Sequence, residues 1–412
     1  MLHINPLRLQ ADFDALAQIG ATGDGGVHRP ALSEAHLAAR QWFRKRAAAD
    51  GFEVRQDTAG NHSAILRLQG ASKTLLLGSH LDSVPNGGRF DGALGVLAAL
   101  EVLRTVKDTG LKLPVHLEAI DFTDEEGTLV GLLGSEAITG RLTPHALQSP
   151  RGGRAALEEG LARAGLTEEG LLSASRDPSS LAGYLELHIE QGPRLAAAGL
   201  QIGVVKGIVG GRSFRLTFKG QANHAGTTPM DARRDAGQGA SAFLLAAREI
   251  VMQDFPGCVA NVGQMSFEPG AFNVIPARAH LSLEFRSMDP DQLKTMKSAL
   301  LARANAEAER FGLDLDIQPL GGFTATPMHP QTQEDITRAA DTLGLRHISL
   351  ASGAGHDAQS LARITPAGMI FVPSVAGISH DPHEFTEWED CINGANMLLL
   401  AAIEMAKENR RV

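Results

Sequence analysis

Cysteine, an excess of positive charge and long apolar runs are all missing from this chain. Only two of its 412 residues are cysteines, Cys258 and Cys391, which excludes a thiolate metal cluster and favours a reducing, cytoplasmic location. The formal net charge of −9 gives no electrostatic reason to expect nucleic acid or an anionic membrane surface as a partner. No segment resembles a signal peptide or a membrane span. We therefore expect neither nucleic acid nor a membrane as a partner.

Two common enzyme motifs are missing as well. There is no Gly-x-Ser-x-Gly elbow, which argues against a serine hydrolase. The glycines of "GIVGGRS" at 207–213 lack the Gly-Lys-Ser/Thr ending of a phosphate loop, so a hinge explains them better. With 43% hydrophobic and 21% charged residues, the chain has an ordinary globular composition and enough length for two domains.

Strands and helices alternate over the first 190 residues. The helix expected at 33–50 has Ser33 as its N-cap and Gly51 as its stop signal. A second helix is expected at 92–107, among the short apolar runs that indicate strands: 64–68, 74–80, 115–122 and 184–189. This alternation predicts an α/β fold with a mostly parallel sheet sandwiched by helices.

The pattern changes near residue 210. Residues 212–322 have the order β-α-β-β-α-β, which is typical of a small ferredoxin-like α+β domain. Alternating helices and strands then return up to the C-terminal helix. We therefore expect a discontinuous domain of residues 1–211 and 323–412, with residues 212–322 inserted into it.

Imidazoles and carboxylates follow three of the expected strands. In an open parallel sheet, ligands gather where loops leave the carboxyl ends of strands. Such residues, together with one aspartate placed just before a helix, are His80, Asp82, Asp91, Glu125, Glu126, His188 and Glu190. This set without thiolates suits zinc, manganese, cobalt or nickel, and a spare carboxylate can bridge two ions. Of two adjacent glutamates, one can bind metal while the other acts as a general base.

His80 and Asp82 are two positions apart, and side chains two apart on a strand point the same way. The Asp82 carboxylate can therefore accept the second N–H of His80 while the other nitrogen binds metal.

Each of these residues also has a plainer explanation. Asp91 could cap the following helix, His188 could be a packed core residue, and Glu125 with Glu126 could form a solvated turn. The argument for a metal site is that the residues coincide at three strand ends.

The chain resembles the M20 metallopeptidase clan, in particular its amidase/hydantoinase-carbamoylase branch. That branch includes N-carbamoyl-L-amino acid hydrolases, allantoate amidohydrolases and β-ureidopropionases. The resembling stretches are "GSHLDSVPNGGRFDGALGV", "DFTDEEG", "ELHIEQGPRL", "GQANHAGTTPM", "FNVIPARAHLSLEFRS", "SGAGHDA" and "GISHDPHEFT". They run through nearly the whole chain.

The resemblance implies two divalent metal ions, with zinc first and manganese, cobalt or nickel as alternatives. One ion would be held by His80, Asp91 and His188, and the other by Asp91, Glu126 and His380. It further implies that Glu125 is the general base and that Asp82 is the partner of His80. The family pattern Ser-His-x-Pro-x-Glu selects His380 over His383.

The resemblance also implies the substrate contacts. Arg286 would clamp a carboxylate, a role suited to its planar fork of donors. Gln191 and Asn273 would make polar contacts, and the turn containing Gly355 and His356 would form part of the pocket wall. His224 would polarise the scissile carbonyl of the partner subunit, so that the small domain is both lid and homodimer interface. Without the resemblance, Arg286 would be a surface arginine and His224 a loop histidine.

The expected reaction is hydrolysis of the C–N bond of a small N-carbamoyl or ureido carboxylate, such as an N-carbamoyl-L-amino acid or allantoate. The alternatives are an M20-type dipeptidase or aminoacylase, and a non-catalytic scaffold of the same fold. The stretch "TLVGLLGSEA" at 128–137 departs from the Arg-Phe-containing version common in the branch, which leaves the particular substrate open.

Overall fold

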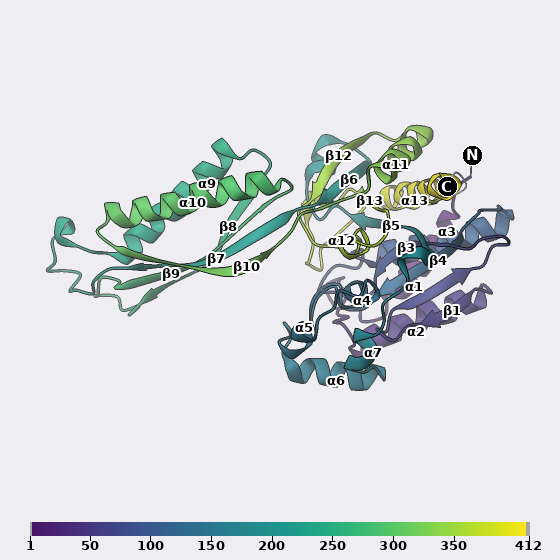
Figure 1. Ribbon diagram of the computed structural model, residues 1–412, viewed down its shortest axis with the longest axis horizontal. Helices are drawn as coiled ribbons and strands as arrows, with labels where there is room; N and C mark the ends of the chain where they lie inside the picture. The colour runs from purple at the N-terminus through teal and green to yellow at the C-terminus, as the bar shows by residue number, and fades with distance from the viewer. Residues whose placement is uncertain (1, 409–412) are drawn as a thin grey trace. The chain divides into compact units, whose positions relative to one another are not determined.

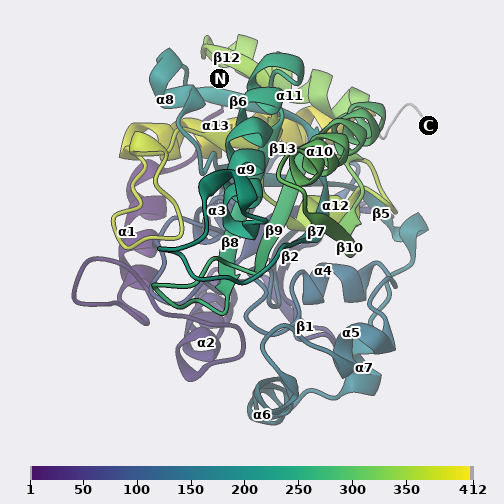
Figure 2. The same cartoon turned by 90° about the vertical axis from the view of Figure 1, so that its left-hand side faces the viewer.

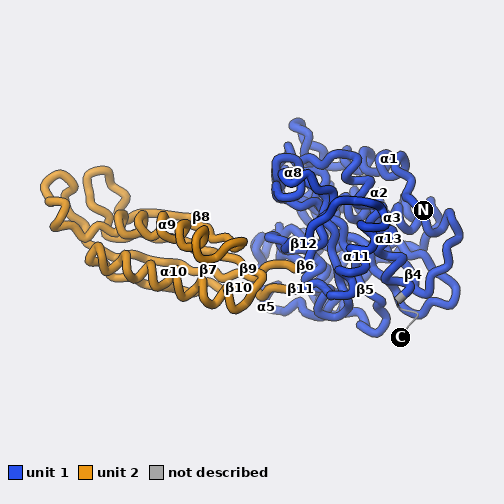
Figure 3. The backbone as a smooth tube through the Cα atoms, turned by 90° about the horizontal axis from the view of Figure 1, so that it is seen from above, with its two compact units in different colours: residues 1–206, 327–412 blue, residues 207–326 orange. Residues whose placement is uncertain are grey.

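The computed structural model describes residues 2–408 of the chain. These residues form two compact units: unit 1 comprises residues 1–206 and 327–412, and unit 2 comprises residues 207–326. Figure 3 distinguishes the two units by colour. The domain borders expected from the sequence, 211/212 and 322/323, remain a prediction.

Unit 1 is built on a nine-stranded mixed sheet. Its strand order is β1-β2-β4-β3-β5-β13-β6-β11, with β12 also paired to β6. The bounds are β1 Glu53–Gln56, β2 His62–Leu66, β3 Thr74–His80, β4 His116–Phe122, β5 Leu181–Ile189, β6 Ile202–Ile208, β11 Thr326–Pro327, β12 His347–Ser352 and β13 Ala367–Val372. The central neighbours β4, β3, β5 and β13 are parallel, whereas β1, β2 and β6 pair antiparallel. The expected α/β fold with a mostly parallel central sheet is confirmed.

Helices cover this sheet on both faces (Figure 1). Their bounds are α1 Pro6–Ala17, α2 Glu34–Ala49, α3 Ala93–Thr109, α4 Leu133–Ile138, α5 Pro144–Gln148, α6 Arg154–Ala164, α7 Glu168–Leu172, α8 Arg194–Ala198, α11 Pro330–Leu343, α12 Asp357–Leu361 and α13 Trp388–Glu408. Every residue of α3 from 93 to 106 is buried, as expected of a helix that is apolar nearly all round. It packs with α1 and α13 in the main core.

Strand β5 shows how the sheet separates its core from its site. Leu185 and Leu187 join the main apolar core, whereas Glu186 points to the other face and accepts the backbone N–H of Ala358 in α12. Because side chains alternate along a strand, His188 lies on the same face as Glu186. That face carries the polar residues described below.

Unit 2 is an antiparallel sheet with the strand order β10-β7-β9-β8. Its elements are β7 Gly210–Lys219, α9 Ala236–Asp254, β8 Val259–Glu268, β9 Arg278–Ser287, α10 Pro290–Arg310 and β10 Asp314–Phe323. Helices α9 and α10 lie side by side (Figure 2) and pack on the strands through a separate apolar core. Leu281, Leu283 and Phe285 of β9 alternate into this core.

None of the helices between residues 2 and 408 combines the length and the apolar character needed to cross a membrane.

Candidate functional site

The parallel centre of the sheet brings three strand ends together. Strand β3 ends at His80, β4 ends at Phe122 just before Glu125, and His188 is the second-last residue of β5. Because β4, β3 and β5 are adjacent and parallel, their carboxyl ends lie along one edge. The strand that follows β3 in sequence, β4, lies on one side of β3, and the next strand, β5, lies on the other side of it. This edge therefore contains a topological switch point, the place where ligands bind in open α/β sheets.

Two imidazoles converge there on one carboxylate. The Oδ1 atom of Asp91 lies 3.0 Å from Nε2 of His188 and 3.5 Å from Nε2 of His80. All three side chains are buried, and one ligand atom from each lies within 4.8 Å of the others. The group has the size and donor set of a metal site.

The second oxygen of Asp91 belongs to another such group. Nε2 of His380 lies 3.6 Å from Asp91 Oδ2 and 3.3 Å from Oε2 of Glu126. Asp91, Glu126 and His380 also meet the 4.8 Å spacing of a metal site. Asp91 therefore presents one oxygen to each of two groups of potential ligands.

Asp91 does not cap helix α3. The N-cap position is Gly92, and no side-chain hydrogen bond caps this helix. Gly92 has a φ of 65°, and a Cβ atom there would lie 2.4 Å from the ring of His80. Only glycine permits both this backbone conformation and the close packing of His80. The capping interpretation of Asp91 is wrong.

Backbone carbonyls orient both buried imidazoles. Nδ1 of His80 lies 3.0 Å from the carbonyl oxygen of Asp82, and Nδ1 of His188 lies 2.9 Å from that of Ile189. A carbonyl oxygen only accepts, so Nδ1 carries the proton and Nε2 is left as the ligand atom in both rings. This is the tautomer that a metal site requires.

Asp82 is the partner of His80 through its backbone carbonyl, and the hydrogen bond expected to its carboxylate is not made. The carboxylate Oδ1 lies 3.8 Å from His80 Nδ1, farther than the carbonyl. Strand β3 ends at His80, so the two-residue alternation does not continue to Asp82. The Asp82 carboxylate instead accepts the backbone N–H groups of Glu125 at 3.3 Å and Glu126 at 3.2 Å, and thereby holds the turn that carries both glutamates.

Glu125 and Glu126 do not form a solvated turn, because their side chains are only 9% and 6% exposed. Oε2 of Glu125 lies 3.6 Å from His80 Nε2, but Glu125 belongs to neither of the two groups that share Asp91. Burial raises the pKa of both glutamates well above the usual range. Burial acts in the same direction on Asp91, yet His188 and His80 hold its pKa well below the usual value.

The donors fit divalent cations. Nε2 of His80 and Oε1 of Glu126 are buried without a hydrogen-bond partner, although buried polar atoms normally have one. Several carboxylates buried together repel one another unless cations compensate their charge. Imidazole and carboxylate donors suit zinc or manganese.

Polar residues from two loops, one after β5 and one before α13, surround Asp91. Gln191 donates from Nε2 to Asp91 Oδ2 at 2.8 Å, and Oε1 of Gln191 is buried without a partner. Glu384 accepts the backbone N–H groups of Phe90 at 3.1 Å and Asp91 at 3.0 Å through one oxygen, and the hydroxyl of Ser379 at 2.8 Å through the other. We predicted no role for Glu384 from the sequence. It is the last residue of the Ser-His-x-Pro-x-Glu pattern, which could have indicated it.

Two other histidines were possible competitors. His356 is buried, and its ring lies 4.5 Å from that of His188. It forms a third candidate group with Glu186 and His188, and burial lowers its pKa well below the usual value. Gly355 lies exposed beside it. His383 is exposed and contacts the carboxylate of Asp381, outside every group that could hold a metal within the described residues.

The remaining expected substrate contacts lie in unit 2. His224 and Asn273 are on neighbouring exposed loops, joined by a 3.0 Å hydrogen bond from the N–H of Ala225 to the carbonyl of Asn273. Arg286 donates to Glu284 at 2.6 Å, and its guanidinium lies 5.7 Å from the ring centre of Phe323. Their roles towards substrate remain predictions.

The layered α/β fold and the polar site are those expected of a hydrolase that binds divalent metal ions. Residues 76–404 match the family model of peptidase family M20/M25/M40. The chain is 37% identical to N-carbamoyl-L-amino acid amidohydrolase of Geobacillus stearothermophilus, over 97% of this chain and 98% of that protein. It is 33% identical to ureidoglycolate hydrolase of Arabidopsis thaliana, over 98% and 87%.

A solved structure is equally similar. The hydantoinase/carbamoylase family amidase of Burkholderia multivorans superposes with a TM-score of 0.90 at 36% identity, covering 98% of both chains. This chain therefore belongs to the M20/M25/M40 family, within its hydantoinase/carbamoylase amidases.

Proposed function

We propose that this chain is an amidohydrolase with two metal ions, which cleaves the C–N bond of a small N-carbamoyl compound that bears a carboxylate. The observation that carries the proposal is the position of Asp91, which is shared by two groups of potential metal ligands while Glu125 lies beside them and belongs to neither. The names of the relatives, an N-carbamoyl-L-amino acid amidohydrolase and a ureidoglycolate hydrolase, support the bond type.

The ligand sets follow from the two groups. His80, Asp91 and His188 would hold one ion, and Asp91, Glu126 and His380 the other. Two divalent ions, with zinc as the first candidate, would supply Lewis acidity that lowers the pKa of a water molecule and polarises the carbamoyl oxygen. The hydrogen bonds from Nδ1 of His80 and His188 to backbone carbonyls keep both rings in the binding tautomer.

Glu125 performs the proton transfers in this proposal. Its carboxylate takes a proton from the attacking water while the water oxygen forms a bond to the carbamoyl carbon. When the C–N bond to the amino acid nitrogen breaks, Glu125 returns the proton to that nitrogen. The products are the amino acid and carbamic acid, which decomposes to carbon dioxide and ammonia. Burial, which raises the pKa of Glu125, suits a group that must accept and then release a proton.

The substrate contacts in this proposal are those that the family resemblance implies. Gln191, with a free buried Oε1, would accept an N–H of the ureido group, and the turn at Gly355 would form part of the pocket wall. Arg286 would bind the substrate carboxylate with Asn273, and His224 of a partner subunit would stabilise the oxyanion. The first substrates to test are N-carbamoyl-L-amino acids, followed by allantoate and N-carbamoyl-β-alanine.

We infer that unit 2 also carries a homodimer interface. Strand β8 is an edge strand of its sheet, and edge strands readily pair with a second chain. On α9, Leu245 and Met252 are 64% and 62% exposed and, being seven residues apart, lie on one side of the helix. An exposed apolar stripe beside an open sheet edge supports self-association.

The adjacent glutamates provide a matched test. With manganese- or zinc-loaded protein, Glu125→Gln should lower kcat by about 100- to 10,000-fold while the metal content stays at the wild-type level. Glu126→Gln should lose metal as well as activity. Metal content by mass spectrometry and ammonia release on the three substrate classes measure both effects, and dipeptides are assayed in parallel.

The alternatives give different results. Preferred cleavage of dipeptides would replace the proposal with the peptidase alternative. A wild type without stoichiometric metal and without turnover of any substrate would favour the scaffold. Unchanged activity in Glu125→Gln would remove the general-base assignment.

A further inference from the structure

Two cavities lie on opposite faces of the sheet edge formed by β1 and β2. In the register of this pair, Arg55 is opposite Ser63 and Gln56 is opposite His62. Because side chains alternate, the first pair points to one face and the second pair to the other. The two cavities differ in charge.

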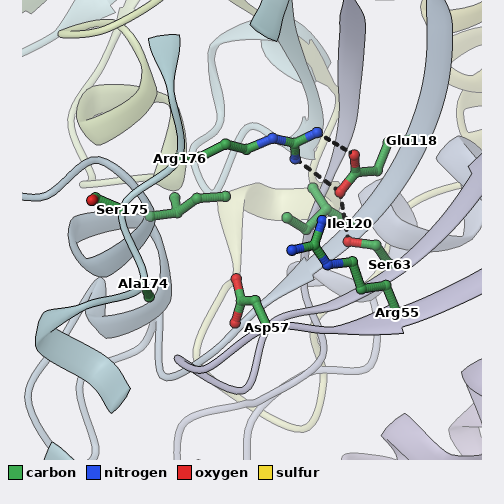
Figure 4. A pocket seen from close by; sticks show the side chains of 9 residues that line it. Arg55, Asp57, Ser63, Glu118, Ile120, Ala174, Ser175 and Arg176 are labelled. Carbon is green, nitrogen blue, oxygen red and sulfur yellow. Dashed lines mark hydrogen bonds and ion pairs between the residues drawn. The ribbon is translucent and has the colours of Figure 1, made fainter. Parts of the chain in front are cut away.

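The cavity on the Arg55 side is neutral (Figure 4). It has a volume of about 200 Å³ and contains two arginines and two acids, namely Arg55, Arg176, Asp57 and Glu118. Arg176 donates two hydrogen bonds to Glu118, at 3.0 and 2.7 Å, and the hydroxyl of Ser63 donates a third at 2.7 Å. Its charges compensate one another within the protein.

The cavity on the His62 side, here called the arginine cavity, has no acid in its lining. Its volume is about 170 Å³ and its lining residues are Leu37, Arg40, Gln41, Arg44, Gln56, Gly60, His62, Arg163, Ala164 and Leu166. Four of them come from α2 at positions 37, 40, 41 and 44, a spacing that places them on one side of the helix. Three guanidinium groups and two amides therefore meet without a carboxylate among them.

Two of the three guanidinium groups have no compensating charge. Arg40 is buried and paired with Asp121 at 2.9 Å, so its charge is balanced. Arg163 donates to the carbonyl of Leu32 at 2.8 Å, which is a neutral partner. Arg44 makes no hydrogen bond or ion pair within residues 2–408. The cavity thus carries an excess of about two positive charges.

His62 contributes a buried imidazole to this wall. Its side chain is buried, with 6% exposure, and its Nδ1 atom has no hydrogen-bond partner. Burial, followed by Arg40 and Arg44, lowers the pKa of His62 to about 2. The neutral form of the imidazole tolerates the nearby charges of Arg40 and Arg44. A bound anion would offset these charges and so remove part of the pKa shift.

We propose that the arginine cavity binds a small oxyanion, either inorganic phosphate or the phosphate group of a small phosphomonoester. Arg44 and Arg163 provide the planar, charged donors that match phosphate oxygens. No lining residue belongs to the metal groups or to their contacts described above, so this is a second site that does not depend on the proposed activity.

Arg44 is the residue to change, because Arg40 also anchors the end of β4 through Asp121 and the carbonyl of Phe122. The holoenzyme is titrated calorimetrically with phosphate at constant ionic strength set by chloride. Arg44→Gln should weaken binding about tenfold or more, since it removes a charge-assisted donor. Arg55→Gln, the matched change in the neutral cavity, should leave binding unchanged.

Titrations with inorganic phosphate and with glycerol phosphate distinguish the two possible ligands. Tighter binding of glycerol phosphate than of phosphate identifies an ester as the ligand, and the reverse identifies free phosphate. In wild type, phosphate should also shift the ring signals of His62 in NMR spectra, assigned by their loss in His62→Gln. Phosphate that binds equally to wild type and Arg44→Gln would lie elsewhere, for example at the metal ions, and would overturn the proposal. Absence of binding at millimolar phosphate would overturn it as well.

Discussion

Glu384 allows a quantitative test of how the proposed metal centre is held together. Its carboxylate joins two loops 294 positions apart, because Oε1 accepts the N–H groups of Phe90 and Asp91 and Oε2 accepts the hydroxyl of Ser379. Glu384→Ala would leave the two buried N–H groups without a partner. At about 1–3 kcal/mol for each unsatisfied group, partly offset by water, the free energy of unfolding should fall by about 3 kcal/mol.

Glu384→Gln should cost much less, under about 1 kcal/mol. The amide oxygen can keep both N–H groups, and the amide nitrogen can donate to the Ser379 hydroxyl. That hydroxyl can then donate to Asp91 Oδ2, which lies 3.3 Å away. Burial, followed by Asp91, raises the pKa of Glu384 to about 7, so replacing the carboxylate also removes a buried charge.

The assay compares urea unfolding with metal affinity. Glu384→Ala should lower affinity for the added metal about 10- to 100-fold, the usual cost of losing a group that orients a ligand. Asp381→Ala is the control and should change neither quantity, because the half-exposed carboxylate of Asp381 in the same loop accepts hydrogen bonds only from His383. If Glu384→Ala kept both wild-type stability and wild-type metal affinity, Glu384 would not position Asp91.

Three further outcomes test other parts of the structure. Inactive Glu125→Gln and inactive His224→Ala subunits, when co-expressed, should recover about a quarter of wild-type activity if His224 acts across a homodimer; no recovery would place it in its own subunit's site. Leu245→Glu with Met252→Glu should convert the proposed dimer to a monomer, as measured by light scattering coupled to size-exclusion chromatography; an unchanged mass would remove the α9 face from the proposed interface. His62 stays neutral in the folded protein, whereas in the unfolded chain it takes up a proton below pH 6.5. This histidine therefore lowers the free energy of unfolding as the pH falls. In chloride buffer, His62→Asn should reduce the loss of unfolding free energy between pH 7 and pH 5 by about 2 kcal/mol; an equal loss in both proteins would mean that His62 is protonated in the fold.

Local patterns in the sequence predicted several helices and strands correctly. The spacing of apolar residues indicated β3, β4 and β5, and Ser33 caps α2 by accepting the N–H of His36, as its position suggested. Strand ends indicated which imidazoles and carboxylates would share one edge, because parallel neighbours end on the same side. These signals are local, so they could be found without knowing the fold.

The sequence by itself determined the elements, the polar residues at their ends and the family. Only the tertiary structure decided that the carbonyl of Asp82 rather than its carboxylate orients His80, and that Glu384 holds the Asp91 loop. The same is true of the arginine cavity, whose lining comes from three separated segments. The physical reason is that these contacts depend on sheet order and on where a strand stops, and neither periodicity nor spacing along the chain encodes those.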